Sequence, residues 1–289
     1  MNRNVLRGGV MLLTVPMAVL AFVCRGAQED QRDSRVRTFV YPKRIVWQTA
    51  ANKFDDGWPE RAKAEKMEKL LERKFGQVCE GPFGSKSGTK LVNKGEPAGF
   101  ILDFGQELHG GVQIGVSPDG TSGARLRLRF GESVSETMSS VGDGRHAMNE
   151  HALRDFELPM PLFGSIEVGN TGFRFLRIDL VTGGEVGFEF VRAVSLMRPM
   201  KATGAFRSSD ERLNCVFDTA VRTVHLCCQE YLWDGIKRDR LVWAGDMHPE
   251  TMTILNVFGA DSVLSDSIDY LAAVTPSDRW MHGMAPYTL

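Results

Sequence analysis

The chain has 289 residues, 43% of them hydrophobic and 25% charged, which are the proportions of an ordinary folded protein. Its 35 Lys and Arg nearly balance its 36 Asp and Glu, so there is no electrostatic reason to expect a nucleic-acid partner. The 30 Gly and 12 Pro are too few and too scattered for a fibrous or disordered chain, and the length allows about two domains at ~150 residues each.

The N-terminus has a short basic start followed by an apolar run of 14 residues, 10–23. This order is typical of a secretory signal peptide, which we place at residues 1–27. The run is shorter than the ~20 apolar residues of a membrane-spanning helix, and Pro16 would break such a helix. We therefore expect export to the periplasm or the extracellular space without a stable membrane span. A lipid anchor on Cys24 is the alternative.

The cysteines after the signal peptide show no pattern of a disulfide framework or a zinc site. Cys227 and Cys228 are neighbours, and such pairs rarely bond because the geometry is strained. Cys215 lies twelve residues before Cys227 on one predicted helix, and Cys79 is far away in the sequence. We expect buried free thiols.

Residues 28–94 form a polar N-terminal segment that we expect to be partly helical. The charged stretch 60–74 carries Met67, Leu70 and Leu71 at helical spacing. It predicts a surface helix with one narrow apolar stripe.

Residues 95–203 predict several short strands bounded by turns. The stretches 112–116 and 125–130 alternate apolar with small or polar residues, as half-buried strands do. In the second stretch the arginines at 125, 127 and 129 would face solvent. Further strands are predicted at 172–180 and 187–190. The spacing favours a β-sandwich of jelly-roll-like type.

From residue 204 to 289 the pattern is helical. Ser208 and Glu211 form a capping-box pattern before an apolar face that runs from Leu213 to Val224. Further helices are predicted from Pro249 to Gly259 and from Asp261 onward. The fold class is therefore multi-domain β plus α.

The loop between the first two helices, residues 231–250, is the densest group of acids, bases and tryptophans in the chain. Carboxylates accept hydrogen bonds from sugar hydroxyls, an indole face covers the apolar side of a sugar ring, and a protonated carboxyl can release its proton to a leaving oxygen. The pattern indicates a carbohydrate site, provided that the three aspartates share a cavity. The alternative is a solvated loop whose aspartates pair with the arginines and cap the next helix. The residues concerned are Asp234, Arg238, Asp239, Arg240, Trp243 and Asp246.

The same loop resembles the signature of family 78 glycoside hydrolases, the bacterial α-L-rhamnosidases, which runs Asp-Cys-Pro-x-Arg-Glu/Asp-Arg-x-x-Trp-x-Gly-Asp. Gly235 and Ile236 replace the Cys-Pro pair. Stretches 99–105, 129–136 and 171–175 resemble the β-sandwich that precedes the catalytic barrel in this family, and the likeness continues through 280–286. The signature positions that match are Asp234, Arg238, Asp239, Arg240, Trp243, Gly245 and Asp246.

The resemblance implies a role for each matching side chain. Asp239 would be the general acid that protonates the glycosidic oxygen. Asp234 and Asp246 would hold rhamnose hydroxyls, with Arg238 close by and Trp243 lining the pocket. The family mostly inverts configuration, which requires a second carboxylate ~6.5–9.5 Å away to activate water.

The resemblance also implies the architecture of the C-terminal part. The family's general base is a glutamate late in an (α/α)6 barrel of the six-hairpin glycosidase type. Residues 204–289 have room for only the first helices of such a barrel, so we expect an incomplete barrel and a base beyond Leu289.

We therefore expect a glycoside hydrolase that resembles inverting α-L-rhamnosidases and removes terminal α-L-rhamnose from glycosides or polysaccharides. Its partner would be a rhamnose-containing carbohydrate, and we expect no cofactor and no metal. The alternatives are a non-catalytic carbohydrate-binding remnant of such an enzyme and an interaction protein that assembles through exposed helix faces. Trp280 could stack on a second sugar or lie in the core, and the spacing of His146 and His151 matches no metal motif.

Overall fold

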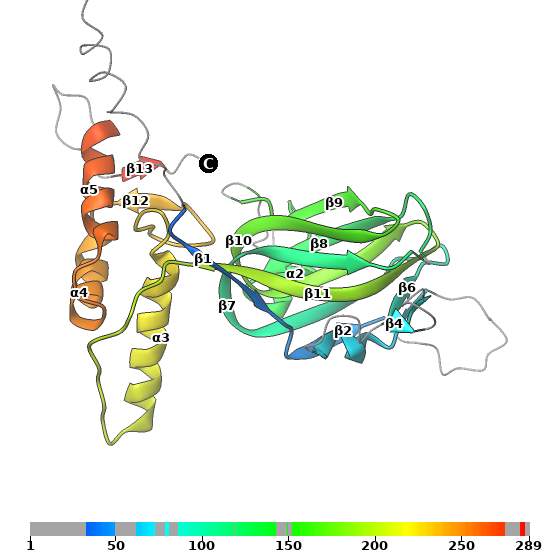
Figure 1. The fold of residues 1–289 in the computed structure, drawn as a ribbon, viewed down its shortest axis with the longest axis horizontal. Coiled ribbons are helices and arrows are strands. Elements are labelled where there is room, and N and C mark those ends of the chain that lie inside the picture. The colour runs from blue at the N-terminus through cyan, green and yellow to red at the C-terminus, as the bar shows by residue number, and fades with distance from the viewer. Residues whose placement is uncertain are drawn as a thin grey trace, which may run out of the picture. The chain divides into compact units, whose positions relative to one another are not determined.

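Figure 1 shows the computed structural model, which describes residues 33–49, 62–72, 79–80, 86–118, 120–142, 149, 152–274 and 284–286. The chain divides into two units, Met1–Asp33 and Ser34–Leu289, and everything below concerns the second. The predicted signal peptide, Cys24, His146, His151 and Trp280 lie outside the described residues.

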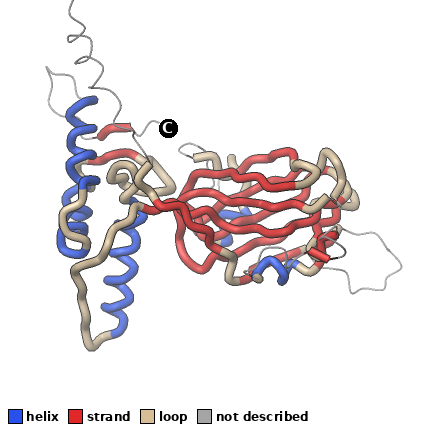
Figure 2. Tube along the Cα trace, in the orientation of Figure 1, coloured by secondary structure: helices blue, strands red, loops and turns tan. Residues whose placement is uncertain are grey.

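The larger part of the second unit is a nine-stranded antiparallel sheet, here called the β domain (residues 36–197). Its strands lie in layers around one core, as a β-sandwich does, which confirms the predicted fold class (Figure 2). β1 (Val36–Val40) pairs with β11, and β2 (Arg44–Gln48) pairs with β7. The remaining order is β3 (Lys63–Glu65), β6 (Lys90–Val92), β11 (Glu185–Met197), β7 (Ala98–Val116), β10 (Gly164–Thr182), β8 (Arg125–Gly131) and β9 (Asp155–Pro159).

β8 shows why these residues form strands and where the prediction was wrong. Leu126, Leu128 and Phe130 alternate along the strand and are buried in the core, as the period of two requires. The prediction that the intervening arginines face solvent fails at Arg129. Its guanidinium is buried and lies 2.7 Å from the carboxylate of Asp179 on β10. A charge can be buried there because it is paired.

The N-terminal segment differs most from its prediction. The structure places β1, β2, β3 and β6 of residues 36–92 in the sheet, so the segment is not simply polar and helical. The expected helix at 60–74 is wrong. Its described part contains β3 and a 3-10 helix, η1 (Met67–Leu71), whose Met67 and Leu70 are buried in the core of the β domain. Two short strands, β4 (Cys79–Glu80) and β5 (Lys86–Ser87), pair with each other.

The predicted helices are confirmed, with small shifts at their starts. They are α3 (Glu211–Cys227), α4 (Met247–Val257) and α5 (Ser262–Val274), here called the helical segment. The N-cap of α3 is Asp210, whose carboxylate accepts a 3.0 Å hydrogen bond from the amide of Arg212, instead of Ser208. Gly259 ends α4 with φ of 81°, a left-handed conformation that favours glycine.

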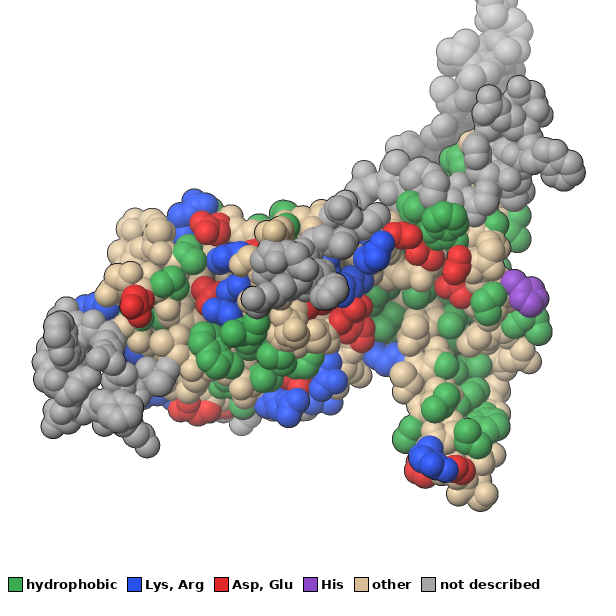
Figure 3. Space-filling model, turned by 180° about the vertical axis from the view of Figure 1, so that it is seen from behind, with side chains coloured by type: hydrophobic (Ala, Val, Ile, Leu, Met, Phe, Trp, Pro, Cys, Tyr) green, Lys and Arg blue, Asp and Glu red, His purple; other side chains and the backbone are tan. Residues whose placement is uncertain are grey.

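Most of the predicted apolar face of α3 is open. Leu213 and Val216 are 49% and 64% exposed, and Phe217 is half-buried. Figure 3 shows hydrophobic side chains gathered on the surface of this part of the molecule. The inner faces of the helices do pack, with Leu226 of α3, Ile254 of α4 and Leu271 of α5 in one apolar cluster.

Among the described side chains, Cys215, Cys227 and Cys228 are free thiols as predicted, but not all three are buried. Cys227 and Cys228 are buried, and burial raises the pKa of Cys227 to about 12, with Glu250 and Asp234 adding to the rise. Cys215 is exposed because it lies on the open face of α3. No helix in the described part of the chain is both long and apolar enough to cross a membrane.

Candidate functional site

The candidate site is the signature loop, defined as residues 234–246, and the β domain holds this loop by its backbone. The amide of Gly172 on β10 donates a 2.9 Å hydrogen bond to the carbonyl oxygen of Ile236. The guanidinium of Arg240 donates a 3.0 Å bond to the carbonyl oxygen of Asn170. A methyl group on Gly172 would lie 2.8 Å from Cγ1 of Ile236, so this close approach requires glycine.

A lysine of the loop is held by two glutamates of the β domain. Nζ of Lys237 lies 2.8 Å from Glu132 and 2.9 Å from Glu136. Glu136 lies in a short helix, α2 (Val134–Met138), that Ser133 caps, and it forms a buried ion pair with Arg154. The short helix turns a buried carboxylate toward Lys237.

Trp233, just before the loop, lies fully buried against the β domain. The imidazole of His109 on β7 meets its ring edge-on at a centroid distance of 5.2 Å. The guanidinium of Arg240 lies 4.8 Å from the centroid of the same indole. Burial, followed by the charges of Arg240 and Arg35, lowers the pKa of His109 to about 3, so this histidine is neutral. The contact is a packing joint between the β domain and the loop.

The loop turns sharply at the predicted general acid. Asp239 and Arg240 have φ of 54° and 57°, which is uncommon for residues other than glycine. The turn is closed on one side by a 2.9 Å hydrogen bond from the amide of Leu241 to the carboxylate of Asp234. Such strained backbone is found where surrounding contacts fix it, and it clusters at functional sites. β12 (Leu241–Trp243) then leaves the turn and pairs with β13 (Met284–Pro286).

The acidic side chains of the loop act on one another. Burial raises the pKa of Asp234, and the charges of Asp239 and Asp246 raise it further, against the hydrogen bond from Leu241. Burial also raises the pKa of Glu250 to about 8, again with contributions from Asp246 and Asp234. The three predicted aspartates therefore share one electrostatic environment, and Glu250 belongs to it. A carboxyl that stays protonated near neutral pH is the kind of group that acid catalysis requires.

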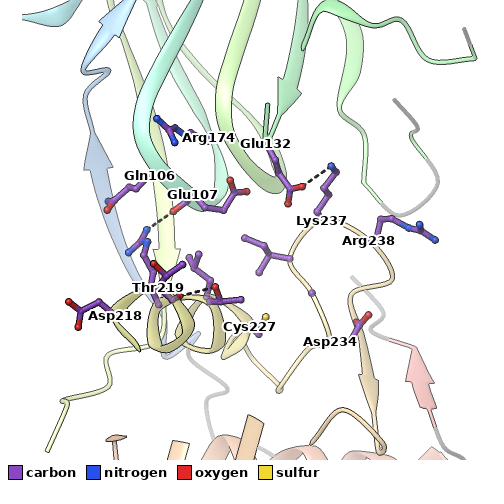
Figure 4. Close-up of a pocket in the computed structure, with 15 residues that line it drawn as sticks. Gln106, Glu107, Glu132, Arg174, Asp218, Thr219, Cys227, Asp234, Lys237 and Arg238 are labelled. Carbon is purple, nitrogen blue, oxygen red and sulfur yellow. Dashed lines mark hydrogen bonds and ion pairs between the residues drawn. The ribbon is translucent and has the colours of Figure 1, made fainter. Parts of the chain in front are cut away.

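A pocket of about 890 Å³ lies between the β domain, α3 and the start of the loop (Figure 4). Of the predicted site residues, Asp234 and Arg238 line it, whereas Asp239, Trp243 and Asp246 lie outside its lining. The full lining is Gln106, Glu107, Glu132, Arg174, Asp218, Thr219, Arg222, Thr223, Leu226, Cys227, Asp234, Gly235, Ile236, Lys237 and Arg238.

The predicted site residues are thus only partly brought together. Asp239 and Trp243 are half-buried, and Asp246 is exposed at the N-cap position of α4 without a side-chain capping bond. The alternative in which the aspartates cap the next helix is wrong for Asp246, whose side chain makes no capping bond. Asp234 does not cap that helix either, because its carboxylate accepts the hydrogen bond from the amide of Leu241 within the loop. In the described part of the chain, no group of three or more His, Cys, Asp and Glu side chains is arranged to hold a metal ion.

Several residues of the site were missed from the sequence. Glu250 follows Asp246 by four positions at the start of a helix, and that spacing could have placed both on one face. Glu107 lies on β7 and Glu132 directly after β8, and the sequence carries no signal that Lys237 of the loop interacts with both. Only the folding of the β domain brings them there.

A comparison with known protein families decides the assignment of the C-terminal part. Residues 201–289 match the model of the bacterial α-L-rhamnosidase six-hairpin glycosidase domain. This segment is similar to that domain. The match contains the signature loop and all of α3, α4 and α5, so it confirms the resemblance that the loop suggested. A comparison with curated protein sequences finds no match.

Solved structures of rhamnosidases share the fold. A rhamnosidase from Klebsiella oxytoca with rhamnose bound superposes with a TM-score of 0.61 at 22% identity, over 88% of this chain and 45% of that one. A family 78 rhamnosidase of Bacillus sp. GL1 gives 0.55 at 19% identity, over 68% and 20% of the two chains. Streptomyces avermitilis α-L-rhamnosidase complexed with L-rhamnose gives 0.51 at 19% identity, over 72% and 22%.

These superpositions include the β domain, because each covers more of the chain than the helical segment alone provides. The rhamnosidase-type segment and the β domain therefore occur together in solved proteins. The chain spans less than half the length of each of these proteins, so the roles of individual side chains rest on the local geometry described above.

Proposed function

We propose that the chain is a glycoside hydrolase of the α-L-rhamnosidase type that acts on terminal α-L-rhamnose in glycosides or polysaccharides. The observation that carries the proposal is the family match over residues 201–289, which includes the signature loop with its mutually interacting carboxyls. The β domain supports it by holding the loop through Gly172, Glu132 and Glu136.

The proposed chemistry assigns Asp239 as general acid. Its carboxyl proton passes to the glycosidic oxygen as the bond from the anomeric carbon to that oxygen breaks, so the leaving sugar departs as an alcohol. Water supplies the hydroxyl at the anomeric carbon, and its proton passes to a second carboxylate, for which we assign no residue in the described part of the chain. Asp234 and Asp246 would hold rhamnose hydroxyls, with Arg238 close by.

Trp243 is proposed to cover the apolar face of the sugar ring. It lies on β12 directly after the strained turn at Asp239 and Arg240, and its side chain is half-buried, which leaves part of the indole open to a ligand.

The test is hydrolysis of an aryl α-L-rhamnoside by the purified chain. Turnover that falls on the order of 10²–10⁴-fold in Asp239→Asn would support the enzyme, because the amide cannot supply the proton. Asp269→Asn, at an exposed position of α5, is the matched control and should retain activity.

Two other outcomes would change the assignment. Binding of L-rhamnose without turnover would support the non-catalytic carbohydrate-binding alternative. Turnover that Asp239→Asn leaves unchanged would remove Asp239 from the role of acid.

A further inference from the structure

The pocket beside the loop contains a carboxyl that the proposed chemistry does not use. Glu107 lies where β7 bends, after Gly105 with φ of 83°. The bend is fixed by buried Asp103, whose carboxylate accepts bonds of 2.8 Å from Arg174, 2.7 Å from the amide of Gly105 and 2.8 Å from Arg44. These bonds outweigh burial and lower the pKa of Asp103 to about 2. These hydrogen bonds fix the backbone at the bend, and Glu107, two residues later, lines the pocket.

Glu107 is surrounded by charged side chains, but its carboxyl is not fully hydrogen-bonded. Figure 4 shows it on the same side of the pocket as Glu132 and Lys237, with Asp218 and Thr219 of α3 opposite. Within the described part of the chain, its Oε1 atom is buried without a hydrogen-bond partner. Burial is the main cause that raises the pKa of Glu107 to about 8. The carboxyl is thus a neutral donor and acceptor at pH 7.

The groups that face Glu107 come from every element around it. Glu132 and Glu136, at the end of β8 and in α2, raise its pKa, whereas Lys237 of the loop and Arg222 of α3 lower it. Arg174 of β10 also interacts with it. Lys237 forms ion pairs with both of these glutamates, and its effect on Glu107 is electrostatic.

Arg222 is the second incompletely bonded group in the pocket. Its guanidinium donates to the backbone carbonyl oxygen of Glu107, and not to the carboxylate. Its Nε atom is buried and has no hydrogen-bond partner among the described residues. The Nε atom is closed off from the pocket, and the guanidinium fixes the backbone that carries Glu107.

The lining fits an uncharged, hydroxyl-rich ring. It includes four acids, Glu107, Glu132, Asp218 and Asp234, and four bases, Arg174, Arg222, Lys237 and Arg238, so neither sign dominates. Leu226, Cys227 and Ile236 add apolar surface for the C–H face of a sugar. The volume of about 890 Å³ lies within the ~300–1,000 Å³ range of small-molecule sites.

We propose that this pocket binds the sugar to which rhamnose is joined, and that the carboxyl of Glu107 hydrogen-bonds a hydroxyl of that sugar. The proposal rests on the proposed function, because the general acid protonates the oxygen of the leaving sugar and that sugar must lie beside it. The pocket borders the proposed rhamnose site at Asp234 and at Arg238, the residue before Asp239. The β domain thereby contributes directly to substrate choice.

The experiment is calorimetric titration of the whole chain carrying Asp239→Asn, so that no substrate is cleaved. L-Rhamnose and α-L-rhamnosyl-(1→6)-D-glucose are the two ligands. Glu107→Leu removes the hydrogen bond, and Glu107→Gln keeps a donor and an acceptor. Glu189→Leu is the matched control, since Glu189 is a half-buried glutamate of β11 outside the pocket.

We expect the disaccharide to bind more tightly than rhamnose, and Glu107→Leu to weaken the disaccharide by about threefold to tenfold, the value of one hydrogen bond, without affecting rhamnose. Glu107→Gln and Glu189→Leu should still bind the disaccharide more tightly than rhamnose, by the same factor as the parent. Above pH 8 the carboxyl of Glu107 loses its proton and can no longer donate a hydrogen bond to the sugar. The preference for the disaccharide over rhamnose should therefore decline in the parent and persist in Glu107→Gln.

Several results would overturn the proposal. Rhamnose binding without any gain from the second sugar, or a gain that Glu107→Leu leaves intact, would exclude the pocket but not the proposed function. Failure of both ligands to bind would contradict both. If Glu107→Leu does not fold, the pH comparison between the parent and Glu107→Gln decides, and equal pH dependence would overturn the role of Glu107.

Discussion

The β domain and the helical segment bury their apolar residues to very different extents. In the β domain, Phe100, Phe104 and Phe173 have exposed fractions of 0%, and the ring of Phe173 packs edge-on against Phe104 and Phe130. In the helical segment, Met252 of α4 and Ile268 of α5 are 51% and 50% exposed. One region has buried its core, and the other presents apolar surface.

The difference follows from the geometry of the two kinds of element. Side chains of a strand alternate between two faces, and hydrogen bonds to its neighbours place each apolar face against the same core. A helix carries its apolar stripe around an arc, so a second neighbour is needed for the part of the arc that the first leaves open. α3, α4 and α5 cover one another on one side only, as Ile254 at 0% and Leu255 at 47% exposure show.

Two carboxyl groups, one from each region, show how neighbouring charges set the pKa. In the β domain, buried Asp103 is hydrogen-bonded by arginines, and its pKa falls to about 2. At the start of α4, Glu250 lies near Asp246 and Asp234, and burial together with their charges raises its pKa to about 8. Paired acids fix a fold, whereas crowded acids that keep a proton are typical of sites that perform chemistry.

The largest expected effect tests the contrast in burial. Leu176→Ala on β10 should lower the free energy of unfolding by about 2–5 kcal/mol, because it opens a cavity in a packed core. The same substitution at Leu255 on α4, where the side chain is 47% exposed, should cost less than about 0.5 kcal/mol. Urea unfolding of both variants gives the comparison, and similar losses would show that the helical face is covered in solution.

A smaller effect tests the joint between the two regions. Gly172→Ala places a methyl group 2.8 Å from Cγ1 of Ile236, so the loop must move away from β10, at a cost of about 1–3 kcal/mol. The fluorescence of buried Trp233 should change as the joint loosens. Gly245→Ala is the matched control, since a methyl group there meets nothing within 4 Å. Equal stability of the two variants would mean that the loop is not held at Gly172.

Much of the fold could be predicted from local patterns. The alternation of Leu126, Leu128 and Phe130 predicted β8, and the capping and glycine signals near Asp210 and Gly259 predicted the limits of α3 and α4. The strands before residue 95 were missed because β1 and β2 add to the edges of β11 and β7, and short edge strands carry little pattern of their own.

Less of the candidate site could be predicted, because its parts come from distant segments. The signature loop is local, so Asp234 and Asp239 could be proposed from its resemblance to the family 78 signature. Glu107 and Glu132 approach Lys237 only through the pairing of β7, β8 and β10, which no single stretch encodes. The unusual backbone at Asp239 and the high pKa of Glu250 depend on packing as well.

The smallest effect concerns Glu250 and the dependence of stability on pH. Between its ordinary pKa of 4.5 and its folded pKa of about 8, the folded chain holds a proton that the unfolded chain has released. The folded state then binds more protons, so its stability falls as the pH rises through this window and stays low above it. Glu250→Gln removes the ionisation and should be more stable than the wild type by about 1 kcal/mol at pH 9, with little difference at pH 4, since solvent screens part of the effect.

The comparison of variants isolates this one group from the others. Glu107 has a pKa of about 8 and contributes a decline of the same sign, so only the difference between the wild type and Glu250→Gln, measured by urea unfolding at each pH, belongs to Glu250. Glu96→Gln, at an exposed position before β7, is the matched control and should follow the wild type at every pH. If Glu250→Gln also follows the wild type, the burial and crowding of acids at the start of α4 do not raise the pKa of Glu250 in solution.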